Sequence, residues 1–266
     1  MWLINGEWRD NIALVERGLQ FGDGCFTSAR VIDGDVRFLD DHMRRLEEGC
    51  RRLDIPMPER QTLLQDITSL AQAERKATLK VVICRGSGGR GYGTSGCGES
   101  VRMLRLFSAP THYADLSERG ALLMPVPVPL GCNPWLAGIK HLNRLEQILI
   151  RKHLDQIQAD EALVLDTEGH LTECCAANLF WRKGKNVYTP RLDRAGVDGT
   201  MRQRILRLLA NSPWHAQQVR APLEALQEAE EVFICNALMP ILPVRQASCW
   251  RYSSRALYQF LAPKCE

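Results

Sequence analysis

The stretch from Glu173 to Arg202 carries the pattern that decides the fold of this chain. It reads Glu173-Cys-Cys-Ala-Ala-Asn178-Leu-Phe180, then Val187-Tyr-Thr189, and then Val197-Asp-Gly199-Thr-Met-Arg202. Runs of β-branched and aromatic residues predict two strands, at Asn178 to Trp181 and at Asn186 to Thr189. A glycine followed by an apolar-faced run predicts a helix that starts near Gly199. Strands and a helix in this order are typical of a mixed α and β unit.

We expect this stretch to lie in a larger C-terminal unit, residues 119–266. The apolar periodicity predicts the other elements of that unit, as helices and short strands. They are a proline-broken strand near Met124 to Val128, a helix from about Leu142 to Gln158, a hairpin of Ala162 to Asp166 with His170 to Glu173, a strand at Val232 to Cys235, and a short C-terminal helix.

A smaller α+β unit is expected at residues 1–108. Asn5-Gly6 and Asp33-Gly34 each stand between apolar segments, which predicts two tight hairpin turns. The periodicity lapses over residues 109–118, where we place the interdomain linker. The other elements of the small unit are expected at Asp40 or Asp41 (the N-cap) to Pro56, Pro58 to about Arg75, Leu79 to Cys84, and Val101 to Phe107.

The composition is that of an ordinary globular protein. The 266 residues are 45% hydrophobic and 24% charged, which excludes disorder, collagen and coiled coil. A net charge of +3, from 34 basic and 31 acidic residues, does not favour nucleic acid or an anionic membrane as a partner. No apolar run has the length of a membrane span, and the first ten residues lack the layout of a signal peptide. We therefore expect a cytoplasmic protein.

The ten cysteines are expected to be thiols, because none falls in a C-x-x-C pair and the chain is long. Five of them stand in apolar runs and are expected to fill the core. No H-E-x-x-H occurs among the six histidines, so no metal is predicted. The expected core cysteines are Cys25, Cys84, Cys174, Cys175 and Cys235.

A glycine-rich stretch, residues 85–93, satisfies the dinucleotide-binding pattern G-x-G-x-x-G. That pattern needs a helix at its end, but the residues that follow cannot propagate one, and the chain enters another strand. We therefore interpret the stretch as a hairpin loop. Its side chains Arg85, Arg90 and Tyr92 could meet an anionic substrate.

Only 7 of the 34 basic residues are lysines, so the place of each lysine is informative. Lys140 stands between a glycine turn and an apolar-faced helix, in Ala137-Gly-Ile-Lys-His-Leu-Asn-Arg-Leu145. Partial burial would lower the pKa of its ammonium group, as an imine-forming lysine requires. A lysine near a helix start is more often a surface residue, and this pattern alone leaves both alternatives open.

The quoted stretch resembles the signature of the class IV aminotransferases, which are fold-type IV pyridoxal-phosphate enzymes. Thr200 stands where an aliphatic residue is usual. Phe21 to Arg30, His42 to Leu46 and Cys235 to Ala237 are similar to other blocks of that family. The resemblance implies an α/β fold with α+β character. It would be a two-domain enzyme like the D-amino-acid aminotransferases, with a small N-terminal α+β domain and a larger C-terminal domain with a barrel-like sheet.

Four blocks are similar to the branch of that family that converts 4-amino-4-deoxychorismate to 4-aminobenzoate and pyruvate in folate biosynthesis. They are Gln20 to Thr27, Arg85 to Tyr92, Gly138 to Glu146, and Ile234 to Pro240. The resemblance covers nearly the whole chain. It implies a lyase that uses pyridoxal 5'-phosphate, and a homodimer whose active sites lie between the two domains, with the partner subunit contributing.

The resemblance also implies a role for each site residue. Lys140 forms the Schiff base and removes the proton, Glu173 faces the ring nitrogen, and Ser28 binds substrate or helps a proton transfer. A separate argument, from the charge of the glycine-rich stretch and the two carboxylates of such a substrate, predicts that Arg90 and Tyr92 bind the substrate, with Arg85 and Arg105 as the next candidates. The residues expected to hold the phosphate are Arg45, Thr200, Met201, Asn236 and Ala237.

Two other functions stay open at this point. A branched-chain or D-amino-acid aminotransferase would use the same cofactor blocks, and would differ in needing a keto acid as acceptor. A cofactor-free small-molecule-binding protein is the more remote alternative, because it would leave the pairing of Lys140 with Glu173 unexplained.

Overall fold

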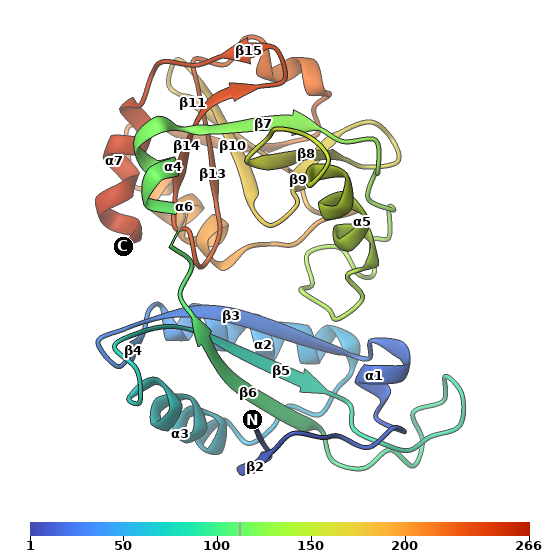
Figure 1. Ribbon diagram of the computed structural model, residues 1–266. Coiled ribbons are helices and arrows are strands. Elements are labelled where there is room, and N and C mark those ends of the chain that lie inside the picture. Colours follow the sequence, from blue (N-terminus) through green and yellow to red (C-terminus); the bar gives the residue numbers. More distant parts are fainter. Residues whose placement is uncertain (112) are drawn as a thin grey trace. The chain divides into compact units, whose positions relative to one another are not determined.

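The computed structural model describes residues 1–111 and 113–266. The chain forms two compact units, each with its own sheet and hydrophobic core (Figure 1). The first unit comprises residues 1–110 together with 139–143, and the second comprises residues 111–138 together with 144–266. Within the described residues, no helix is both long and apolar enough to cross a membrane.

The first unit is built on a six-stranded antiparallel sheet in the order β2-β1-β6-β5-β3-β4. Both predicted hairpin turns are confirmed, because Asn5, Gly6, Asp33 and Gly34 all have positive φ angles, as the tight turn between twisted strands requires. The strands are β1 (Trp2–Ile4), β2 (Glu7–Arg9), β3 (Gly24–Ile32), β4 (Asp35–Val36), β5 (Lys76–Cys84) and β6 (Val101–Ser108).

Two helices, α2 (Leu39–Leu53) and α3 (Arg60–Ala71), cover one face of this sheet (Figure 1). Their apolar side chains pack on the alternate residues of β3 and β5 that point the same way. The opposite face of β3 therefore presents Phe26, Ser28 and Arg30, which are only half-buried. A short helix before β3, α1 (Arg17–Phe21), was not predicted.

The ends of α2 differ from the prediction. The N-cap is Phe38, in a left-handed conformation, and Asp40 and Asp41 lie in the first turn, where carboxylates favour the helix dipole. The helix ends at Leu53, ahead of Pro56, because Asp54 takes a left-handed conformation. The second helix is shorter than predicted at both ends: it starts at Arg60, after the Glu59 carboxylate has capped its first amides, and ends at Ala71.

The second unit is built on a nine-stranded mixed sheet, in which β15 pairs with the last residues of β14. Three pairs are parallel, namely β7 with β8, β7 with β14, and β11 with β12. The strands are β7 (Ala121–Pro125), β8 (Glu161–Leu165), β9 (Leu171–Cys174), β10 (Asn178–Lys183), β11 (Asn186–Pro190), β12 (His215–Val219), β13 (Glu231–Cys235), β14 (Leu242–Ala247) and β15 (Trp250–Arg251).

The helices of the second unit are α4 (Tyr113–Arg119), α5 (Leu145–Leu154), α6 (Thr200–Ala210), the short 3-10 helix Leu223–Leu226, and α7 (Ala256–Cys265). The helix predicted near Gly199 is confirmed as α6. The buried Glu231 carboxylate of β13 caps α7, because it accepts the Leu257 and Tyr258 amides at 3.0 and 2.7 Å. These two hydrogen bonds connect the last helix to β13, a strand in the interior of the sheet.

Two segments depart from the predicted organisation. Helix α4 occupies most of the predicted linker, residues 109–118, and its Leu116 packs in the core of the second unit; His112 lies outside the described residues. The helix predicted from Leu142 starts at Leu145 and ends at Leu154, because residues 139–143 are extended along β3. There the Phe26 amide donates to the Lys140 carbonyl at 3.0 Å.

No disulfide joins the ten cysteines, all of which are among the described residues. Four of the five predicted core cysteines are buried. Cys175 is only half-buried, because it follows the end of β9 in a turn.

His42 of α2 makes the stability of the first unit depend on pH. Its Nδ1 lies 2.6 Å from the Thr27 hydroxyl. Burial, with the Arg45 and Arg30 guanidinium groups, lowers the pKa of His42 from 6.5 to about 3, against the opposing effect of Asp41. The unfolded chain therefore takes up a proton below pH 6.5 that the folded chain refuses.

We expect the free energy of unfolding to fall as the pH drops from 7 to 5, with His42 contributing at most about 1.4 kcal/mol per pH unit. Denaturant unfolding at several pH values measures this slope. His42→Asn, which keeps a polar partner for Thr27, should have a shallower slope. Parallel slopes in parent and variant would contradict the assignment.

Candidate active site

Glu173 lies in β9 of the second unit and is 5% exposed. Its Oε2 accepts the backbone amide of Val197 at 2.7 Å. A Cβ at Gly196 would stand 3.2 Å from the same oxygen and 2.8 Å from Thr172 Cγ2, so the backbone passes unusually close to this carboxylate. The site therefore holds a buried anion in a fixed orientation.

The start of α6 follows directly from this contact. Gly199 is the N-cap residue, and a Cβ there would fall 2.0 Å from Asn178 Oδ1, so only glycine fits. The Asn178 side-chain amide donates to the Val197 carbonyl at 2.8 Å. The first backbone amides of α6 have no acceptor within the helix, and they lie at its N-terminus, which is the positive end of the helix dipole. Such an N-terminus is suited to a phosphate.

Arg202 adds a buried positive charge in the first turn of α6. It is 1% exposed, pairs with Asp198 at 2.7 Å, and donates to the Pro190 carbonyl and to Gln218. Sequence reasoning quoted this arginine but gave it no role. Its charge favours an anion at the same helix start, where Thr200 and Met201 are buried.

Asn236 closes a turn at the end of β13. Its Oδ1 accepts the amides of Leu238 and Met239 at 2.8 and 2.6 Å, and its Nδ2 donates to the Ala176 carbonyl at 3.0 Å. The Asn236 side chain therefore shapes the turn that carries Ala237. If this turn completes a phosphate cradle, as predicted, backbone groups would supply the contact.

Glu161 is a site-supporting residue that sequence reasoning missed. Its carboxylate accepts the amides of Ala162, Cys175 and Ala176 at 2.8, 3.1 and 3.1 Å. Burial raises the pKa of Glu161, and these hydrogen bonds oppose that effect. Glu161 therefore fixes the turn that follows Glu173. Its sequence signal is its position immediately before a predicted strand, Ala162 to Asp166.

Lys140 belongs to the first unit, where it is half-buried beside β3. Its Nζ lies 4.6 Å from the centre of the Phe26 ring, and the Nζ of Lys80 lies 5.1 Å from the same centre. Ser28 is paired with Lys80 in the β3–β5 register. The structure thus places an amine, a hydroxyl and a second ammonium group on one face of the small sheet.

Arg45 is half-buried on α2, near His42 and Cys25, whose titrations it affects. It therefore lies on an element that packs against β3, close to the end of the strand that pairs with residues 139–143. Its predicted contact with a phosphate stays a prediction.

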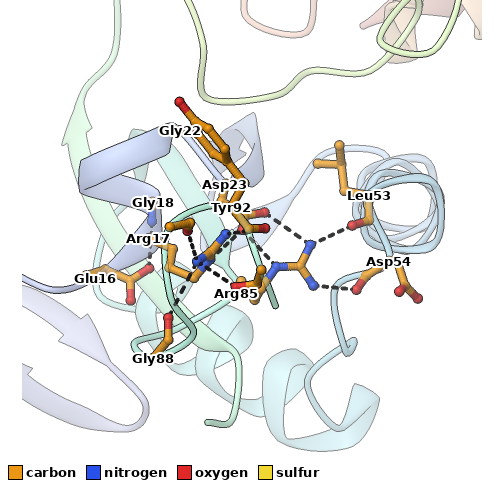
Figure 2. Close-up of polar contacts among 12 residues, drawn as sticks. Glu16, Arg17, Gly18, Gly22, Asp23, Leu53, Asp54, Arg85, Gly88 and Tyr92 are labelled. Atoms are coloured by element: carbon orange, nitrogen blue, oxygen red, sulfur yellow. Dashed lines mark hydrogen bonds and ion pairs between the residues drawn. The ribbon is translucent and has the colours of Figure 1, made fainter. Parts of the chain in front are cut away.

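The glycine-rich loop connects β5 directly to β6 without an intervening helix, as predicted for a hairpin loop. Arg90 is exposed, and Tyr92 is 88% exposed with its ring 5.6 Å from that of Phe21. Arg85 is different, because it is buried and pairs with Asp23 at 2.8 Å (Figure 2). Its remaining donors bind the carbonyls that end α2, so Arg85 is not available as an anchor for substrate.

The candidate residues thus form two sets, each assembled within its own unit. In the second unit, Glu173 and the start of α6 are bound to the Val197 segment, and the Asn236 turn is bound to the Ala176 carbonyl after β9. The first unit gathers Lys140 and Ser28 on one face of β3, with Arg90 and Tyr92 on the loop after β5.

The chain is similar to known proteins over nearly its whole length. The sequence model of class IV amino-transferases matches residues 24–247. The chain is 37% identical to an aminodeoxychorismate lyase of Vibrio harveyi, over 92% of this chain and 90% of the relative. It is 24% identical to a D-alanine aminotransferase of Bacillus licheniformis, over 91% and 86%.

Among solved structures, a 4-amino-4-deoxychorismate lyase from Pseudomonas aeruginosa superposes with a TM-score of 0.93. It is 32% identical in sequence, and the match covers 99% of this chain and 98% of that one. The predicted fold-type IV architecture is therefore confirmed.

Proposed function

We propose, from the premise that this chain belongs to the class IV aminotransferase family, that it is a lyase that converts 4-amino-4-deoxychorismate to 4-aminobenzoate and pyruvate. One observation carries the proposal above all. The similarity to a lyase covers nearly the whole chain at 37% identity, whereas the D-alanine aminotransferase is 24% identical. The two alternatives share cofactor residues, so this difference favours the lyase.

The second unit fits pyridoxal 5'-phosphate. The phosphate is a dianion, and the start of α6 offers unpaired amides, the helix dipole and the buried Arg202. Glu173 offers a buried carboxylate of the kind that keeps a pyridine nitrogen protonated. When bound, the cofactor supplies an aldehyde that condenses with amines and a ring that accepts electrons.

Lys140 would hold the cofactor through its side-chain amine. As a free amine it would remove the proton from the ring carbon that bears the substrate's amino group. Gly138, two residues earlier in the sequence, is paired with the Val197 segment that also binds Glu173. Ser28, on the same face as Phe26, would hydrogen-bond the substrate or pass on a proton.

The remaining electron movement completes the elimination. Electrons from the broken C–H bond expel the enolpyruvyl oxygen, the C–O bond breaks, and protonation of the enol gives pyruvate. The carbocycle becomes aromatic, which makes the step strongly downhill. Glu173 would contribute a carboxylate that keeps the ring nitrogen of the bound cofactor protonated.

The substrate carries two carboxylates, and Arg90 with Tyr92 would bind them. Both residues stand on an exposed loop, where a guanidinium group can reach a ligand. Arg105 is the remaining alternative, because it is only half-buried and stands opposite Lys80 in the β5–β6 register. Its guanidinium group lies over the rings of Phe107 and Trp2, 5.0 and 5.9 Å from their centres.

A second copy of the chain would cover an exposed apolar surface on the second unit. Leu145, Ile148 and Leu149 follow one another at helical spacing on α5 and are 75%, 61% and 50% exposed, and Trp135 is 86% exposed. A homodimer is what the family resemblance implies. A single-chain mass in light scattering would remove this part of the proposal.

Lys140→Ala tests the assignment of the amine. The variant should fold and bind the cofactor, because Glu173 and the start of α6 are unchanged. Its turnover should fall by several orders of magnitude, since nucleophile and base are removed together. Steady-state kinetics and the absorbance of the bound cofactor measure both effects.

Borohydride reduction of the parent should attach the cofactor to the peptide that contains Lys140. Lys80→Ala is the matched control, because its Nζ stands over the same ring, and this variant should still be labelled at Lys140. Label recovered on Lys80 in the parent would overturn the assignment.

Arg90→Ala tests the substrate anchor. Loss of a charge-assisted contact should raise the KM for substrate by roughly ten- to a hundredfold and leave the cofactor spectrum intact. Arg44→Ala is the control, because Arg44 is an exposed arginine on α2, and the KM of this variant should be close to that of the parent. An unaltered KM would transfer the role to Arg105.

A further inference from the structure

Arg17 binds the glycine-rich loop from a distance of more than seventy residues in the sequence. Its side chain is 5% exposed. Nη1 donates to the carbonyls of Gly91 and Gly93 at 3.0 and 3.2 Å. Nε pairs with Asp23 at 2.9 Å (Figure 2). One guanidinium group thus holds the backbone on both sides of Tyr92.

Asp23 connects this contact to the base of the loop. Burial alone would raise the pKa of Asp23, but the hydrogen bonds and charges of Arg85 and Arg17 lower it. Arg85, the first residue of the loop, shares this carboxylate and also donates to the Leu53 and Asp54 carbonyls at 2.7 and 2.6 Å. Arg85 therefore fixes the base of the loop, and Arg17 fixes its tip.

The loop needs such a partner because its own sequence gives it little order. Seven of the thirteen residues from Gly86 to Gly98 are glycines, which have the largest backbone freedom to lose. Its apolar contact is made by Tyr92, whose ring is 5.6 Å from that of Phe21. Phe21 lies on α1, and the Arg17 Cζ stands over its ring, 5.0 Å from the ring centre.

We propose that Arg17 is a positioning residue for substrate binding, which holds Gly91 to Gly93 so that Arg90 and Tyr92 present one arrangement to a substrate carboxylate. This inference rests on the proposed function, because it concerns the same anchors. The Arg17 donors bind Asp23 and the carbonyls of Gly91 and Gly93, so Arg17 would act through the loop.

The first test does not depend on activity. Arg17→Met removes the donors but leaves Asp23 paired with Arg85, so the unit should still fold. Trypsin should cut after Arg90 at least about tenfold faster than in the parent, and amide exchange across residues 86–98 should speed up by a similar factor. Arg17→Lys, which keeps the charge but not the planar fork, should fall in between.

Arg75→Met is the matched control, because Arg75 also pairs with an aspartate in the first unit but is 92% exposed. It should leave cleavage and exchange in the loop unchanged. Parent-like cleavage and exchange in Arg17→Met would overturn the inference, whatever reaction the enzyme performs.

The second test measures kinetics. Loss of positioning should raise the KM of Arg17→Met by about tenfold or more, with kcat and the cofactor spectrum close to the parent and partial recovery in Arg17→Lys. A loosened loop with an unchanged KM would overturn the positioning role. Failure of the proposed function would be seen separately, as a parent enzyme that forms no 4-aminobenzoate.

Discussion

The backbone of Val197 is the constraint on which the candidate site depends. Its amide donates to Glu173 and its carbonyl accepts from Asn178, at 2.7 and 2.8 Å. These two bonds set the path of the chain into Gly199 and therefore the direction of α6. A buried carboxylate and a helix start with open amides are thus fixed by one residue. The same segment pairs with Gly138, which stands two residues before Lys140 in the sequence.

Side chains that bind distant backbone are the second organising feature. Glu161 gathers amides after β9, Glu231 caps α7, and Arg85 and Arg17 bind carbonyls in α2 and in the glycine-rich loop. Glu231, Arg85 and Arg17 are buried and Glu161 is half-buried, and hydrogen bonds to backbone groups satisfy each of these charged side chains. Together they give order to turns and loops that contain little apolar surface.

Local chemistry explains which elements could be predicted from the sequence. The Asn5-Gly6 turn needs only its own residues, and Gly199 with the apolar-faced run after it marks the start of α6, so both elements were predicted. The end of α2 and the extended segment 139–143 were not predicted. The first depends on hydrogen bonds from Arg85, and the second depends on pairing with β3. The cofactor residues were named through a family pattern. Arg17 and Glu161 were missed as functional residues because their partners are distant backbone groups, which no sequence period reveals.

The central claim is that this site eliminates pyruvate and does not exchange amino groups. The direct measurement is incubation of the purified protein with 4-amino-4-deoxychorismate in the absence of any keto acid, with both 4-aminobenzoate and pyruvate quantified over time. The account predicts that the two products form in equal amounts over many turnovers. Product formation that requires an added keto acid, and that yields the corresponding amino acid, would contradict it.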